Sequence, residues 1–212
     1  MPLMKAIRIA LWSLVAVAAS VLAWQTTAGL IDPAGEERAA GIASIGGPFE
    51  GVVSNVENPQ GKPVTQADLV GRPHAIFFGF TNCPDVCPTT LYEATLWLKE
   101  LGDEAGKLDV YFASVDPARD TPEQMAAYLT PFHERISAIS GTEAQMAAMH
   151  KTWGVVAEKG EVRDGEYNVN HTATVFLMDA RGRFFGTIGY GEDPKAAVAK
   201  LRRLLADGSA TS

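Results

Sequence analysis

Two cysteines four residues apart are the groups in this sequence best suited to chemistry. Cys83 and Cys87 are the only cysteines of the 212-residue chain, and they follow directly on an apolar run at residues 74–80. A thiol pair can close a disulfide, pass electrons to another dithiol, or bind a soft metal ion. The elements that position the pair, and the groups brought near it, must decide among these uses.

The segments around the cysteines place them at the beginning of a helix. The continuous apolar run at 74–80 is typical of a central strand that is covered on both faces. Residues 89–101 carry apolar side chains at helical spacing, and Pro88 suits a first helical turn. We therefore expect Cys83 in the loop and Cys87 in the first turn, where the helix dipole should lower a thiol pKa. An inert disulfide or two buried thiols is the simpler alternative.

The rest of the chain predicts an α/β domain. Residues 64–73 are expected to form a short connector, and 153–170 a longer connection in which a small hairpin is possible. The order of elements is that of a thioredoxin-like fold, with a mixed central β-sheet flanked by helices on both faces. Strands are expected at 51–56, 74–80, 108–115, 136–139, 172–178 and 183–188, and helices at 89–101, 121–129, 142–151 and 193–205.

A histidine stands where thioredoxins have a proline. Thioredoxins carry a cis-proline just before the strand that faces the dithiol, but this chain has no proline between Pro131 and Pro194. His171 occupies that place instead, so the fold should bring it to Cys83 and Cys87. Two thiolates and one imidazole suit trigonal Cu(I), and the same set can hold Cu(II) with added ligands. The fold argument therefore predicts a copper site.

The other polar groups and methionines are expected to be structural. Asp116, Arg119 and Asp120 follow a predicted strand, and we expect them to tie their loop to its neighbours or to contact a partner. Asp85, inside the cysteine loop, should face solvent. The other three histidines and three of the methionines are expected to pack in the core or lie at the surface: His74, His133, His150, Met125, Met146 and Met149.

The N-terminal residues are expected to anchor the chain in a membrane. Lys5 and Arg8 precede an uncharged, mostly apolar stretch at residues 9–28, which is long enough to span a bilayer. We expect an uncleaved transmembrane helix within residues 1–28 rather than a cleaved signal peptide. A linker at 29–46, a domain at 47–208 and a tail at 209–212 should follow. Because the positive side is N-terminal, the domain should lie in the periplasm, attached to a bacterial-type inner membrane.

Charge and motifs exclude several kinds of function. The net charge of −7 argues against a nucleic-acid partner. Neither of the common glycine-rich phosphate loops is present. A peroxiredoxin-type peroxidase uses a Thr-x-x-Cys site, whereas a single residue separates Thr81 from Cys83. Nothing in the sequence indicates an obligate dimer, so we expect a monomer.

Three segments, in the same order, resemble the Sco/SenC family. They are GFTNCPDVCP at 79–88, SVDPARDTPE at 114–123 and VNHT at 169–172. The resemblance implies a membrane-anchored, thioredoxin-like domain whose copper ligands are Cys83, Cys87 and His171. It also implies a role in maturing the dinuclear copper centre of cytochrome c oxidase subunit II.

An alternative is a thiol–disulfide oxidoreductase that reduces the cysteines of a copper-receiving partner. Cys83 and Cys87 would then be the catalytic dithiol and would form a disulfide during turnover. One dithiol can serve both purposes, so the two functions can coexist. His171 discriminates between them, because a pure oxidoreductase does not need an imidazole at that place.

Two positions depart from the commonest family pattern. Asn82 stands where members often have a histidine or another ring residue, and Asn170 stands where they usually have an aspartate. A carboxylate beside a ligand imidazole orients the ring and raises its basicity. We expect the change at Asn170 to alter copper affinity, redox poise or partner choice while leaving the site in place.

Overall fold

The computed structural model describes residue 12 and residues 45–209. No helix in this part of the chain is long and apolar enough to cross a membrane. Apart from residue 12, the predicted transmembrane helix within residues 1–28 lies outside the described residues, as does most of the predicted linker. Residues 45–209 belong to one compact unit.

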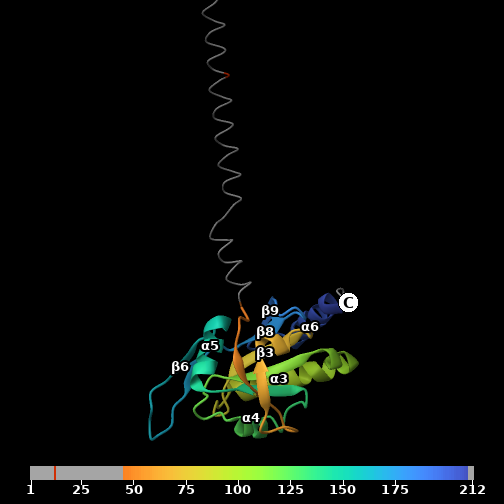
Figure 1. Ribbon diagram of the computed structural model, residues 1–212. Coiled ribbons are helices and arrows are strands. Elements are labelled where there is room, and N and C mark those ends of the chain that lie inside the picture. Colours follow the sequence, from red (N-terminus) through yellow and green to blue (C-terminus); the bar gives the residue numbers. More distant parts are fainter. Residues whose placement is uncertain (1–11, 13–44, 210–212) are drawn as a thin grey trace, which may run out of the picture. The chain divides into compact units, whose positions relative to one another are not determined.

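A seven-stranded mixed sheet forms the centre of this unit (Figure 1). The strand order is β2-β1-β5-β4-β3-β8-β9, in which β3, β4 and β5 are parallel and the other neighbours antiparallel. Strands β6 and β7 form a separate two-stranded sheet. The strands are β1 (Glu50–Ser54), β2 (Lys62–Thr65), β3 (His74–Gly79), β4 (Asp109–Ser114), β5 (Ile136–Ser140), β6 (Ala157–Lys159), β7 (Val169–His171), β8 (Thr174–Met178) and β9 (Phe184–Gly189).

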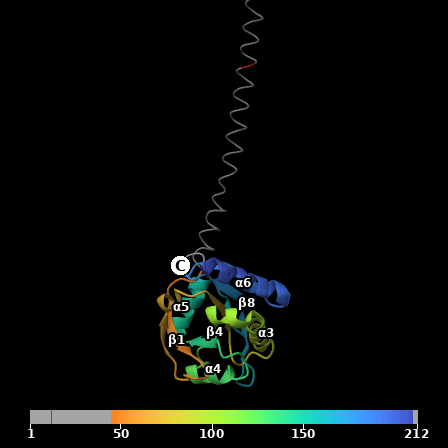
Figure 2. The same ribbon diagram turned by 90° about the vertical axis from the view of Figure 1, so that its right-hand side faces the viewer.

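Helices cover both faces of the main sheet (Figure 2). Phe77 and Phe78 are adjacent in β3 and therefore point to opposite faces. Phe77 faces α3 and α6, whereas Phe78 packs against Trp153 of α5. Tyr128 of α4 stacks on Phe112, which itself stacks on Phe77, so α4 lies on the α3 face. The helices are α3 (Val86–Leu101), α4 (Pro122–Tyr128), α5 (Glu143–Trp153) and α6 (Pro194–Ser209), with short 3-10 turns η1 (Gln66–Leu69) and η2 (Gly102–Lys107).

The mixed sheet between helices confirms the predicted thioredoxin-like fold. Every residue of β3 is buried, as its unbroken apolar run predicts for a strand covered on both faces. Because β3 and β4 are parallel, both end at the same edge of the sheet. The cysteine loop and the loop of residues 115–121 therefore start side by side.

Helix α3 starts earlier than its apolar spacing predicts, at Val86 rather than at 89. Pro88 is its third residue, where a missing N–H breaks no helical hydrogen bond. The next two helices begin as predicted, because the hydroxyls of Thr121 and Thr142 accept from the third backbone N–H of each helix.

The predicted connector at 64–73 was wrong in its first part, since Lys62–Thr65 form β2 beside β1. This edge strand has four residues of which only Val64 is buried, so it shows almost no alternation. Pro63 also reads against a strand, although edge strands tolerate proline.

The possible hairpin is present in residues 157–171, which comprise β6, β7 and the turn between them. Asp164 and Gly165 take positive φ values of 53° and 84° at its tip. These residues are called the hairpin below.

Candidate metal centre

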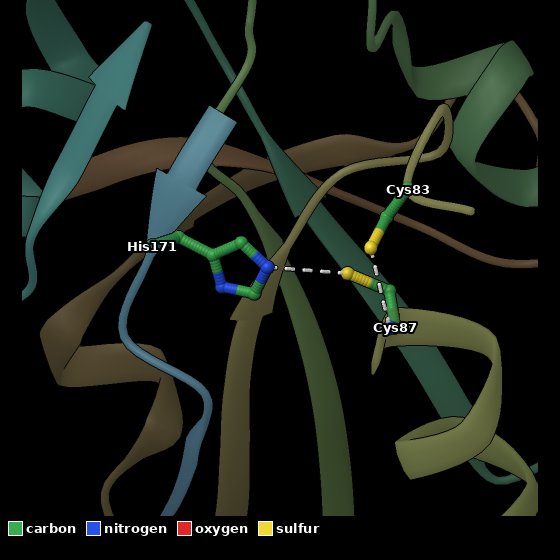
Figure 3. A group of neighbouring side chains, drawn as sticks. All are labelled: Cys83, Cys87 and His171. Carbon is green, nitrogen blue, oxygen red and sulfur yellow. Dashed lines mark hydrogen bonds between the residues drawn. The ribbon is translucent and has the colours of Figure 1, made fainter. Parts of the chain in front are cut away.

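Cys83, Cys87 and His171 meet at the edge of the main sheet (Figure 3). One potential ligand atom from each residue lies within 4.8 Å of the other two. The Nε2 atom of His171 is 3.5 Å from the sulfur of Cys87. The backbone N–H of Cys87 donates to the sulfur of Cys83 over 3.4 Å. Within residues 45–209, no other cluster of three His, Cys, Asp or Glu side chains has this geometry.

Each of the three side chains is placed by a different kind of element. Cys83 lies in the loop after β3, and Cys87 lies in the first turn of α3, as predicted. His171 is the last residue of β7, in which Val169 is buried and Asn170 is exposed. Strand alternation therefore turns the imidazole inward beside the sulfurs.

The two sulfurs have different environments. Cys87 is fully buried, whereas Cys83 is partly exposed, and neither is in a disulfide. Burial raises the pKa of the Cys87 thiol strongly, and the nearby Cys83 adds to this effect. The prediction that the helix terminus lowers a thiol pKa is therefore wrong for Cys87, because loss of water around the thiolate outweighs the backbone dipoles.

The tautomer of His171 follows from its backbone neighbour. Its Nδ1 lies 3.2 Å from the carbonyl oxygen of Thr172, which can only accept, so Nδ1 carries the proton. The Nε2 lone pair then faces the sulfurs, with that of Cys87 at 3.5 Å. Burial lowers the pKa of His171, against the smaller opposing effect of carbonyl groups, and so favours the neutral form that binds metals.

Aromatic rings form the apolar wall behind the imidazole. Phe77 and Phe80 form T-shaped contacts with the His171 ring at centroid distances of 6.1 Å and 5.7 Å. These contacts account for the partial burial of the ring. They also limit the positions that the ring can adopt opposite the cysteines.

Asp120 holds the cysteine loop against the end of β4. Its carboxylate accepts from the Thr81 hydroxyl at 2.6 Å, from the Thr81 N–H at 3.2 Å and from the Ser114 hydroxyl at 2.7 Å. Burial raises the pKa of Asp120, and these three donors oppose the rise. The sequence indicated only that Asp120 belongs to a loop, because its partners lie on other segments.

The two residues that depart from the family pattern both lie outside the ligand cluster. Asn170 is exposed on the opposite side of β7 from the imidazole. Thr172, not residue 170, supplies the partner of the His171 Nδ1. Asn82 is exposed as well, and its amide donates to Glu166 of the hairpin over 3.2 Å.

The groups expected to be structural are exposed, bonded to the backbone or buried in the core. Asp85 is exposed, as predicted. The ring of His150 bonds to the Ser114 carbonyl, and that of His133 accepts from the Arg135 N–H. The buried members of the set are His74, Met125, Met146 and Met149.

A thioredoxin-like domain with a histidine facing its dithiol defines a class of proteins that can bind a soft metal ion or carry out thiol exchange. The profile described as SCO1/SenC matches residues 37–206. The chain therefore belongs to the SCO1/SenC family.

Related proteins and structures agree with this membership. Protein SCO2, mitochondrial, of Saccharomyces cerevisiae is 36% identical over 168 residues, which are 78% of this chain and 54% of the relative. The chain thus spans about half the length of the curated relatives it matches. Bradyrhizobium japonicum ScoI with copper bound is 42% identical, with a TM-score of 0.69, over 76% of this chain and 99% of that structure. Yeast Sco1 with copper bound is 33% identical, with a TM-score of 0.68, over 80% of this chain and 95% of that structure.

Proposed function

We propose that this chain binds copper through Cys83, Cys87 and His171. It delivers the metal to, or helps assemble, the dinuclear copper centre of cytochrome c oxidase subunit II. The observation that carries the proposal is the convergence of three donor atoms within 4.8 Å. Two sulfurs and an imidazole nitrogen form a set that suits Cu(I), and both copper-bound relatives belong to the same family.

The chain's own groups prepare this set for copper as a cargo. The Thr172 carbonyl keeps the proton on Nδ1 of His171 and leaves Nε2 available. The partly exposed Cys83 offers the accessible sulfur, while the buried Cys87 loses its proton only on binding. Asp120 keeps the loop that carries Cys83 in place.

Replacement of His171 tests the ligand set. We expect the reduced full chain to bind one copper ion, and His171→Ala to weaken binding by more than about tenfold, because one of three donors is lost. Competition with a chelator measures both Cu(I) and Cu(II) affinity. His133→Ala is the matched control, since its ring accepts only a backbone N–H at 3.2 Å. Equal affinities of His171→Ala and the parent would show that the three-ligand assignment is wrong.

Delivery is tested with the soluble copper domain of subunit II. Copper-loaded parent chain should transfer the metal to the reduced acceptor, and the transfer should depend on both cysteines. Mass spectrometry of the separated proteins measures the copper on each. Tight binding without any transfer would argue for storage instead of delivery.

The second candidate function is thiol–disulfide exchange with a copper-receiving partner. The unequal exposure of the two sulfurs favours it, because an accessible thiol can attack while a buried one resolves the mixed disulfide. Cys83 and Cys87 would be oxidised to a disulfide as the partner's disulfide is reduced to two thiols. A strongly reducing potential, with activity toward the oxidised acceptor, would support this function; an unreactive disulfide would reject it.

The same proposal includes an uncleaved membrane anchor within residues 1–28 and a domain on the periplasmic side of the inner membrane. The apolar stretch after Lys5 and Arg8 supports both points. Fractionation of cells that express the full chain should place it in the membrane. Protease added to spheroplasts should then degrade the domain.

A further inference from the structure

Arg119, in the loop between β4 and α4, joins that loop to the hairpin. Its Nη2 donates to the carbonyl of Tyr167 over 3.0 Å, and its Nη1 lies 3.4 Å from the Glu166 carboxylate. Its guanidinium also lies 3.7 Å from the centre of the Tyr167 ring. On its other edge, Nε donates to Asp116. The side chain thus forms hydrogen bonds through the edges of its guanidinium and a cation–π contact through its face, a combination that the planar guanidinium group allows.

The loops beneath the hairpin make further bonds to the same two hairpin residues. The Tyr167 hydroxyl donates to Asp116 over 2.7 Å, and the Asn82 amide donates to Glu166 over 3.2 Å. Asp116 is only 5% exposed and Arg119 is 24% exposed, so this ion pair is largely shielded from water. A shielded, multiply bonded pair holds its geometry better than an exposed one.

Arg119 reaches His171 by two routes. Along the chain, Tyr167 lies four residues before His171 and two before the start of β7. Through space, the Arg119 guanidinium lies 5.8 Å from the centre of the Phe80 ring, which packs against the His171 ring at 5.7 Å. Strands β6 and β7 pair three residues each, one more bridge joins Arg163 to Glu166 near the tip, and the hairpin belongs to no larger sheet. A ribbon this short is marginal without outside support.

We propose that Arg119 is a positioning residue that holds the hairpin, and with it His171, against the two cysteines. The inference rests on the proposed function, because it concerns the same ligand set. A three-donor site needs its ligands held within a fraction of an ångström, and His171 is the donor carried by the short hairpin outside the main sheet. Arg119 supplies support that the strand pairing lacks.

A double-mutant cycle tests the inference. Arg119→Ala should weaken copper binding by about tenfold, a typical effect of losing a group that orients a ligand. In the His171→Ala background the same change should have almost no effect, because the ligand it positions is gone. If Arg119 acted only through its charge on the thiolates, its effect would persist without His171, and the inference would be overturned.

A copper-free measurement separates this inference from the proposed ligand set. Arg119→Ala should speed amide hydrogen exchange in β6 and β7 of the metal-free full chain by about tenfold or more, while β3 and β4 stay protected. Unchanged exchange in the hairpin would overturn the inference, whatever copper does. If exchange rises but His171→Ala binds copper like the parent, the ligand assignment fails instead, and with it any role of Arg119 in holding a ligand.

The matched control is Arg183→Ala, which removes an ion pair of 2.6 Å to Asp179, a carboxylate that is 6% exposed. It should lower the melting temperature without changing copper affinity. Should Arg119→Ala fail to fold, Arg119→Lys replaces it, because lysine keeps the positive charge but lacks the planar set of N–H donors. Arg119→Lys should shift the absorption band of the Cu(II)–thiolate bond and weaken binding; parent-like values for both would count against the inference.

Discussion

Cys87 occupies a place where its sulfur has almost no room. A β-carbon at Gly79 would lie 2.7 Å from that sulfur and 2.6 Å from the ring of Phe112. Both neighbours are fully buried and cannot move aside cheaply. The missing side chain at residue 79 is therefore part of what sets the position of the buried sulfur.

Gly79→Ala should disturb both stability and the site. We expect the free energy of unfolding to fall by about 1–3 kcal/mol, as for other overpacked cores, and copper binding to weaken because Cys87 must shift. Urea unfolding and chelator competition measure the two effects. Gly186→Ala in β9 is the control, because nothing lies within 4 Å of its added carbon. An unchanged copper affinity in Gly79→Ala would contradict this account of the sulfur.

At the residue scale, the sequence predicted which elements carry the two cysteines, but it did not predict the distant residues that bury Cys87 or bond to Arg119. The strand, the proline and the helical spacing located Cys83 and Cys87 correctly. The predicted direction of the Cys87 pKa shift was wrong, because burial of this thiol depends on side chains that come from other elements. Arg119 was expected to tie its loop to neighbours; besides the nearby Asp116, it has two partners that lie 47 and 48 residues further on, in a segment without a periodic pattern.

At the element scale, the hairpin stands apart because it carries a candidate ligand outside the main sheet. Its turn needs two residues with positive φ, which Asp164 and Gly165 provide. Glycine adopts this conformation without cost, and aspartate tolerates it better than most residues. The turn therefore helps to set the register of β7.

Gly165→Ala should weaken the hairpin selectively. The added carbon meets nothing within 4 Å, so the cost is backbone strain alone, about 1 kcal/mol. We expect faster amide exchange in β6 and β7, a lower copper affinity, and a fall of no more than about 1 kcal/mol in the free energy of global unfolding. Asp164→Asn should behave like the parent, since asparagine also accepts positive φ. Equal exchange rates in parent and Gly165→Ala would show that the turn does not limit the hairpin.

Elements with strong periodicity or caps were predictable, and short ones were not. The apolar run of β3 and the threonine caps of α4 and α5 each carry a local signal. β2 and η2 lack one: the first is stabilised by pairing with β1, and the second by its place between α3 and β4. Such elements form because tertiary neighbours complete them.

At the scale of the whole molecule, one buried and one partly buried histidine link stability to pH. Burial lowers the pKa of His74 and of His150 below their ordinary value of 6.5, although Asp109, Asp179 and backbone carbonyls partly oppose this. The unfolded chain then binds protons below pH 6.5 that the folded chain does not. Stability is therefore full above that pH and falls as the pH drops below it.

Metal-free protein should lose up to about 1.4 kcal/mol of unfolding free energy per pH unit for each such histidine, below pH 6.5. Urea unfolding at a series of pH values between 7.5 and 5.5 measures the slope. His74→Phe should make the curve flatter, because it removes one of the protons that only the unfolded state takes up. A slope equal to the parent's would show that His74 is protonated alike in both states.

The split of the three donors between two sheets has a consequence for the kinetics of exchange. Cys83 and Cys87 follow the seven-stranded sheet, while His171 ends a two-stranded one. If this set binds copper as proposed, it would be what coordination chemistry calls a hemilabile chelate, with two firmly held ligand arms and one arm that can dissociate. Release of the imidazole arm would open a coordination position without unfolding the domain, so a donor from an acceptor protein could enter before either sulfur leaves. Transfer would then follow an associative path, with a rate set by acceptor concentration and hairpin opening and not by global stability.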